Sequence, residues 1–174
     1  MTALTSALID YWQKLPQRPS AARRRLLDEV HRGVRRGERD ASALIPFALA
    51  DSDDDVVSGA TAAFLAVAQD EPARTAAAHD ASEWVRRGLA CNRGAVFAAL
   101  LLRGEERVNE KLLPLRLTLS EDDVATVCRR VARRSCERSR AFLQDWHELL
   151  SGEAMARQRA HIAASLAVER PRVA

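Results

Sequence analysis

The stretch LIPFALADSDDDVV (residues 44–57) occurs a second time, with substitutions, as LLPLRLTLSEDDVA (residues 112–125). Aligned without a gap, the two stretches share Leu, Pro, Leu, Ser, Asp, Asp and Val in that order. A weaker third copy, ASEWVRRGLACNRGAVF, starts at Ala81 and aligns with ASALIPFALADSDDDVV, which starts at Ala41. The copies are therefore about 40 and then 28 residues apart. Repeats of this length are typical of stacked helical units.

Each copy predicts two helices joined by a polar turn. In the first copy, we expect a short apolar helix over residues 42–50, a turn over 51–55, and a second helix that starts at Val56. Small and apolar residues follow Val56 at the spacing of one helix face. Pro46 and Pro114 fall in the first helix of their copies, where a proline lies near the first turn or kinks the helix.

The repeated acidic phrase is interpreted as a helix start. Ser52 with Asp55, and Ser120 with Asp123, have the S-x-x-D spacing of a capping box. Carboxylates at this end are also stabilised by the helix dipole. A calcium loop is the other interpretation of D-x-D-x-D. It requires Gly at the sixth position and Glu at the twelfth, where this chain has Val56 and Ala62.

Composition favours an all-α chain. Of 174 residues, 47% are hydrophobic, only 5% are aromatic, and seven Gly and six Pro interrupt the sequence. No run of alternating β-branched residues predicts a strand. Further helices are expected near residues 5–15, 20–36, 135–150 and 153–168. We therefore predict one helical-repeat domain over 1–168, with capping helices in 1–40, three repeat units in 41–134, capping helices in 135–168, and a flexible tail at 169–174.

The pattern L-x-P-x-x-L, an acidic turn, and Val followed four residues later by a small residue resembles the HEAT repeat. In the first copy these positions are Leu44, Pro46, Leu49, Asp54, Val56 and Ala60. In the last copy they are Leu112, Pro114, Leu117, Asp122, Val124 and Cys128. The Arg or Lys that the family usually has after this Val is replaced by Val57 and Ala125. The resemblance implies antiparallel helix pairs stacked as a short α-solenoid, or superhelix.

The sequence predicts a cytoplasmic protein with no membrane span, cofactor, metal site or catalytic residue. No stretch of about 18 apolar residues occurs, and the start of the chain lacks the pattern of a signal peptide. Three cysteines, an odd number without a CxxC motif, indicate a reducing compartment. No P-loop, G-x-S-x-G or H-E-x-x-H motif is present. Cys136 precedes a predicted helix beside arginines, which favours a lowered thiol pKa.

Arginines supply the candidate binding residues. The net charge is +3, and a basic stripe lies on and after the second helix of the last copy. The candidate binding residues are Arg129, Arg130, Arg133, Arg134, Arg138 and Trp84. The arginines would contact phosphates in a nucleic-acid complex, or form a solvated face that pairs with carboxylates of neighbouring repeats. Trp84 replaces the leucine of the other copies, either as an exposed anchor or as a larger core residue.

Two classes of function follow from this surface. The first hypothesis is a protein-interaction module, such as a bacterial adaptor or an antitoxin-like immunity protein, that binds a protein partner on its helical-repeat surface. The alternative is a nucleic-acid-binding HEAT-like protein, in one form similar to a DNA glycosylase, that uses the Arg stripe of residues 129–140. A self-assembling structural subunit is a third hypothesis. Pairing of the stripe with Asp53–Asp55 and Glu121–Asp123 would favour the interaction module.

Overall fold

A computed structural model describes residues 19–68, 70–103, 106–134 and 136–168. Over these ranges the chain forms α-helices and short 3₁₀ turns and no strand, which confirms the all-α prediction there. The helix expected near residues 5–15 lies outside the described residues. The α-helices are α2 (Ser20–Arg35), α3 (Ile45–Ala50), α4 (Asp54–Ala66), α5 (Glu71–Arg86), α6 (Arg93–Arg103), α7 (Glu106–Leu112), α8 (Glu121–Arg134), α9 (Glu137–Leu149) and α10 (Ala156–Ala167).

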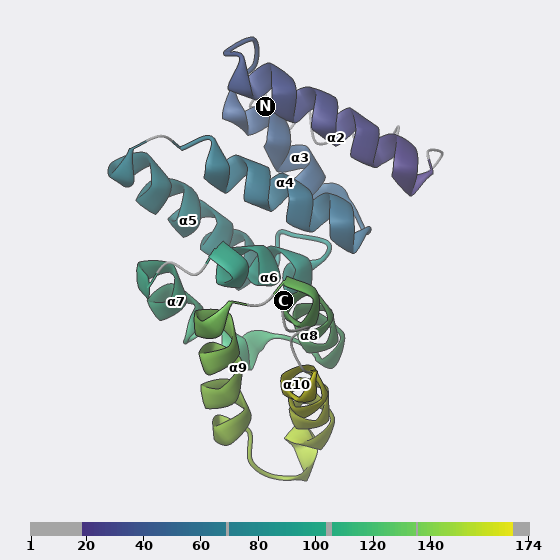
Figure 1. The fold of residues 1–174 in the computed structure, drawn as a ribbon, viewed down its shortest axis with the longest axis vertical. Helices are drawn as coiled ribbons and strands as arrows, with labels where there is room; N and C mark the ends of the chain where they lie inside the picture. The colour runs from purple at the N-terminus through teal and green to yellow at the C-terminus, as the bar shows by residue number, and fades with distance from the viewer. Residues whose placement is uncertain (1–18, 69, 104–105, 135, 169–174) are drawn as a thin grey trace, which may run out of the picture.

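The helices follow one another along the long axis of the molecule, from α2 at the top of Figure 1 to α9 and α10 at the bottom. Helices α2, α4, α6, α8 and α10 form a series in which each packs against the next. The other helices flank this series: α3 packs on α4, α5 on α4 and α6, α7 on α5 and α6, and α9 on α10. The second helix of each predicted repeat unit is thus a member of the central series.

One of the two predicted capping boxes differs in detail from the sequence interpretation. The N-cap of α4 is Asp53, whose carboxylate accepts from the backbone N–H groups of Asp55 and Val56, so the predicted Ser52 box is replaced by a cap one residue later. The expected box at α8 is present. Its Ser120 hydroxyl accepts from the Asp123 N–H at 3.2 Å, and the Asp123 carboxylate accepts from the Ser120 N–H at 3.1 Å. The cap residue of α2 is Pro19, with Ser20 inside the helix.

The prolines explain where the first helices of the repeat units depart from expectation. Pro46 lies in the first turn of α3, where its missing N–H costs nothing, and a 3₁₀ turn over Ala41–Leu44 precedes it. In the last copy, α7 ends at Leu112 and a turn follows at Pro114, since a residue before proline avoids the helical conformation. The first period is longer than the second because it also contains the first half of α5, which precedes the second copy at Ala81.

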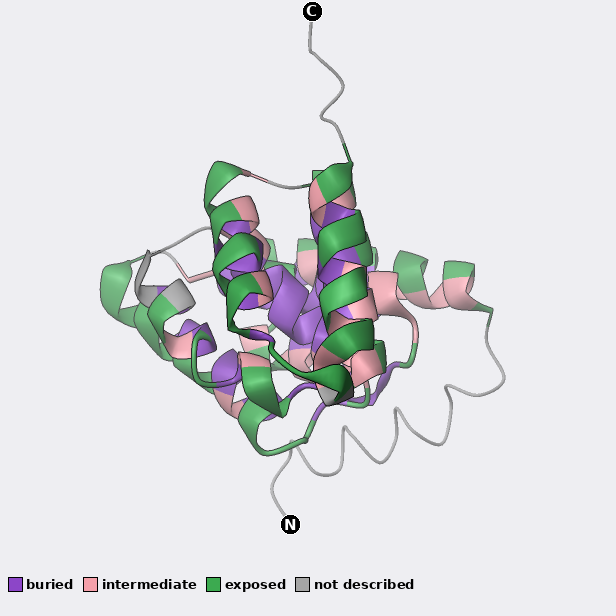
Figure 2. Cartoon of the chain, turned by 90° about the horizontal axis from the view of Figure 1, so that it is seen from below, coloured by how far each residue is buried: buried purple, intermediate pink, exposed green. Residues whose placement is uncertain are grey.

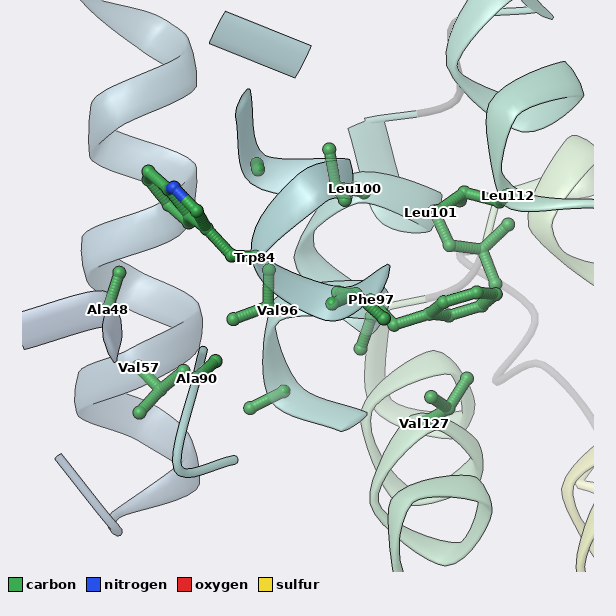
Figure 3. Packing of buried hydrophobic residues seen from close by; sticks show 14 of the residues in the cluster. Ala48, Val57, Trp84, Ala90, Val96, Phe97, Leu100, Leu101, Leu112 and Val127 are labelled. Carbon is green, nitrogen blue, oxygen red and sulfur yellow. The ribbon is translucent and has the colours of Figure 1, made fainter. Parts of the chain in front are cut away.

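The core centres on α6, in which eight consecutive residues, from Gly94 to Leu101, are buried. Figure 2 shows exposed faces on the outer helices and buried residues gathered between them. Phe97 of α6 lies 6.0 Å from Phe142 and 5.7 Å from Trp146, ring centroid to ring centroid, which ties α6 to α9. Figure 3 shows Phe97 among the leucines and valines of the same core.

In the described part of the chain, no helix is long and apolar enough to cross a membrane.

At Gly94 the backbone of α6 lies close to the backbone of α8. A Cβ at this position would lie 2.4 Å from the Asp123 carbonyl oxygen and 2.7 Å from its Cα, both backbone atoms. The Gly94 N–H also donates to the Asp123 carboxylate at 2.8 Å. The glycine therefore permits the contact that brings the two helix starts together.

Gly94→Ala is expected to destabilise the fold by about 2 kcal/mol, because two backbones must separate and the gain in helix propensity only partly offsets this. Gly59→Ala is the matched control, since its Cβ meets only the flexible tip of Leu27 at 3.2 Å. Urea unfolding followed by circular dichroism measures both changes. We expect the Gly59 variant to unfold at or above the wild-type midpoint. Equal midpoints for the two variants would contradict the close approach.

Candidate binding groove

A groove of about 740 Å³ lies between α4 and α8, with α6 at its floor. One wall comes from α4, the opposite wall from α8, and α2 contributes at one end. The described lining residues are Arg24, Asp55, Ser58, Gly59, Ala62, Leu65, Ala99, Leu102, Arg103, Arg130, Arg133 and Arg134. Five of these side chains are arginines and one is a carboxylate, so the groove is strongly basic.

The wall formed by α4 is made of small residues. Ser58, Gly59 and Ala62 lie on the groove side of the helix, and Gly59 and Ala62 are exposed. Ala99 and Leu102 of α6 give the floor an apolar character. Between Asp55 and Leu65, the larger α4 residues that line the groove, these small side chains leave the helix surface open, while the facing wall presents guanidinium groups.

Ion pairs join the two walls at the start of α4. Asp55 lies 2.6 Å from a guanidinium nitrogen of Arg24 and 2.6 Å from one of Arg130, so arginines from two helices share one carboxylate. Arg129 pairs with Asp54 at 3.1 Å. The acidic run of the first repeat thus meets the basic stripe of the last, which are far apart in the sequence.

The same acidic run is fixed from the other side. Arg24 also contacts Asp53 at 3.1 Å, and the side-chain amide of Asn92 donates to Asp54. Partial burial alone would raise the pKa of Asp53, but hydrogen bonds from Val56, Arg24 and Asp55 bring it below the usual range. Asp53 therefore stays ionised while it caps α4 and holds Arg24.

Arg133 and Arg134 lie farther along the groove. Both are exposed, and neither forms an ion pair or hydrogen bond with another described residue. The acidic turn of the last repeat does not neutralise them, since Glu121 instead lies 3.7 Å from Arg157 and 3.8 Å from His161. Of the stripe, Arg129 and Arg130 therefore pair with the Asp53–Asp55 run. Among the described residues, no arginine of α8 pairs with Glu121–Asp123.

The remaining predicted site residues lie elsewhere. Arg138 is exposed on α9 and does not line the groove. Its neighbour Arg140 donates to the carbonyls of Leu166 and Val168, at the end of α10. Trp84 is only 7% exposed, and its ring lies 5.1 Å from that of Phe64. Figure 3 shows Trp84 against the core, so it is a core residue and not a surface anchor.

Sequence reasoning missed one end of the groove. Arg24 belongs to a run of three arginines, Arg23 to Arg25, that gives no indication which member faces α4. Arg23 turns instead to the buried Asp51, at 2.8 Å. Helical spacing from Leu27 and Val30 places both Arg23 and Arg24 near the face of α2 that packs on α4, so it does not select between them. Arg103 ends α6 and carries no sequence signal of its own.

No family model matches the chain, and no curated protein or solved structure matches it. Among the residues that the structure describes, no three His, Cys, Asp or Glu side chains are grouped so as to hold a metal ion. The groove itself therefore provides the evidence on function.

The three cysteines have different environments. Partial burial alone would raise the pKa of Cys136, but hydrogen bonds of its side chain with the backbone N–H and the hydroxyl of Ser139 and with the backbone N–H of Arg138 lower it below the ordinary value. Burial raises the pKa of Cys128 to about 12. Cys91 is exposed as a residue, but partial burial raises the pKa of its thiol, and the negative charge of Asp51 raises it further.

Iodoacetamide at neutral pH is expected to modify Cys136 first, because only the thiolate reacts and its thiol ionises most readily. Cys91 should follow as pH rises, and Cys128 should stay protected until the chain unfolds. Peptide mass spectrometry over a time course measures the order. Modification of Cys128 at the rate of Cys136 in the native protein would contradict these environments.

Proposed function

We propose that this chain is a protein-interaction module whose binding site is the groove between α4 and α8. The observation that carries the proposal is the pairing of Arg129 and Arg130 with Asp54 and Asp55, which leaves Arg133 and Arg134 as basic groups beside a wall of small residues. Such a surface combines charge for recognition with room for close packing, as protein interfaces require.

The order of helix contacts supports a helical-repeat surface. Helices α4, α6 and α8, the second helices of the three predicted units, pack in sequence order, with α3, α5 and α7 beside α4 and α6. We propose that they are units of a short HEAT-like stack, in which equivalent helices build one extended binding surface. An adaptor and an antitoxin-like immunity protein, both cytoplasmic, remain the two forms of this function.

Nucleic-acid binding is the second candidate function, and the basic character of the groove favours it. Phosphates would contact Arg133 and Arg134. Two features oppose it. The described lining residues include no aromatic side chain on which a base could stack, and Asp55 places a carboxylate in the lining of the same groove. A glycosylase-like activity would also need a carboxylate and aromatics facing the substrate.

Replacing Arg133 and Arg134 by Glu is expected to abolish capture of a specific protein partner, because the charge that remains accessible in the groove is reversed. The measurement is affinity capture of the tagged protein from lysate of its own cells, with and without nuclease. The matched control replaces Arg86 and Arg87, exposed arginines at the end of α5, which have the same charge and lie outside the groove.

The proposal is supported if wild type and the α5 control both retain a partner that the groove variant loses. Retention of that partner must also be unaffected by nuclease. Material that nuclease removes supports nucleic-acid binding instead. A partner retained equally by all three proteins rules out the groove as the site. Circular dichroism and urea unfolding confirm that both double variants keep the fold.

A further inference from the structure

We infer that the groove recognises an acidic segment of the partner polypeptide, and that Asp55 occupies the place of the partner's carboxylate in the free protein. The inference rests on the proposed function, because it specifies the chemistry of the partner at the same site. Its basis is the arrangement of charges and small residues around Asp55.

The first argument is charge complementarity. Five arginines and one aspartate line the groove, and Arg133 and Arg134 have no ion-pair partner among the described residues. Carboxylates pair with guanidinium groups through short, charge-assisted hydrogen bonds. An occupant with several carboxylates therefore matches the α8 wall better than a neutral or basic one.

The second argument comes from Arg130. Its side chain is 13% exposed, and its Nη2 atom lies 2.6 Å from Asp55. The Nη2 nitrogen is shielded from solvent, and its contact with Asp55 is an ion pair without hydrogen-bond geometry. A shielded guanidinium nitrogen without a hydrogen bond is costly. A carboxylate that takes the place of Asp55 can supply that hydrogen bond.

The third argument is that Asp55 is displaceable. Its side chain is 40% exposed, and Arg24, its other partner, is 46% exposed. Ion pairs this open to solvent contribute little to stability. When Asp55 moves away, Arg24 still forms an ion pair with a second carboxylate, that of Asp53. An external carboxylate can therefore replace Asp55 without breaking the cap of α4, which Asp53 provides.

The shape of the groove favours a peptide over a nucleic acid. Gly59 and Ala62 leave space for a backbone beside α4, and Leu102 supplies apolar contact at the floor. A polynucleotide would bring a phosphate at every nucleotide, including beside Asp55, the carboxylate that lines the groove. A peptide carries carboxylates only at the positions that face arginines, so it avoids this repulsion.

The test is fluorescence anisotropy with the full chain and a labelled short peptide of glutamate and alanine, at low salt. We expect saturable binding that weakens as salt rises, and loss of about tenfold or more with the Arg133→Glu, Arg134→Glu variant. The Arg86→Glu, Arg87→Glu control should bind within about twofold of wild type. A peptide with Gln in place of Glu should not bind.

Asp55→Asn tests the displacement. The variant keeps a similar side-chain shape but no longer competes for Arg24 and Arg130, so the peptide should bind about threefold more tightly than to wild type. The matched control is Asp122→Asn, in the corresponding acidic turn of the last repeat, which does not line the groove. Unchanged or weaker peptide binding with Asp55→Asn overturns the displacement.

Three results overturn the acidic-segment inference: equal binding of the Gln peptide, equal binding by the groove and control variants, and displacement of the Glu peptide by a poly-dT oligonucleotide that itself binds more tightly. The capture experiment separates this failure from failure of the proposed function. A protein partner lost with the groove variant, together with no Glu-peptide binding, leaves the interaction module standing and rejects its acidic ligand.

Discussion

Burial of α6 on all its sides is the constraint on which the rest of the structure depends. A helix with eight consecutive buried residues, Gly94 to Leu101, cannot present a polar face, so neighbours must cover it completely. Small residues allow them to come close, and Gly94 brings α6 against the backbone of Asp123. Once α4 and α8 both pack on α6, the acidic start of one helix reaches the basic stripe of the other. The groove is the space left between them.

The acidic run therefore has two roles at once. Asp53 satisfies the backbone donors at the start of α4, while Asp54 and Asp55 neutralise arginines of α8. Capping is local and needs only the chain around residue 53. The ion pairs need the tertiary fold, since the paired residues are 75 positions apart. The carboxylate that caps α4 is therefore not one of the two that pair with α8.

Local signals in the sequence predicted local structure well. The repeated phrase predicted the starts of α4 and α8, because capping depends on residues three positions apart. The all-α class followed from composition. The sequence left open whether Trp84 is buried or exposed. Its burial depends on tertiary contacts, such as that with the ring of Phe64, which residue spacing does not predict. The groove needed Arg24, from a helix far upstream, and only packing shows which of three successive arginines faces α4. The stack itself remains a proposal.

The small-residue wall of α4 and the arginine wall of α8 divide the groove into a part that fixes shape and a part that fixes charge. The shape wall is constrained, because a Cβ at Gly59 would meet Leu27 of α2 and the same helix contributes Val56 and Ala60 to the core. Arg133 and Arg134 have exposed side chains at the last turn of their helix. In the proposed interaction module, substitutions there would change which partner is accepted at little cost to folding, so specificity could diverge on one wall while the other keeps the scaffold intact.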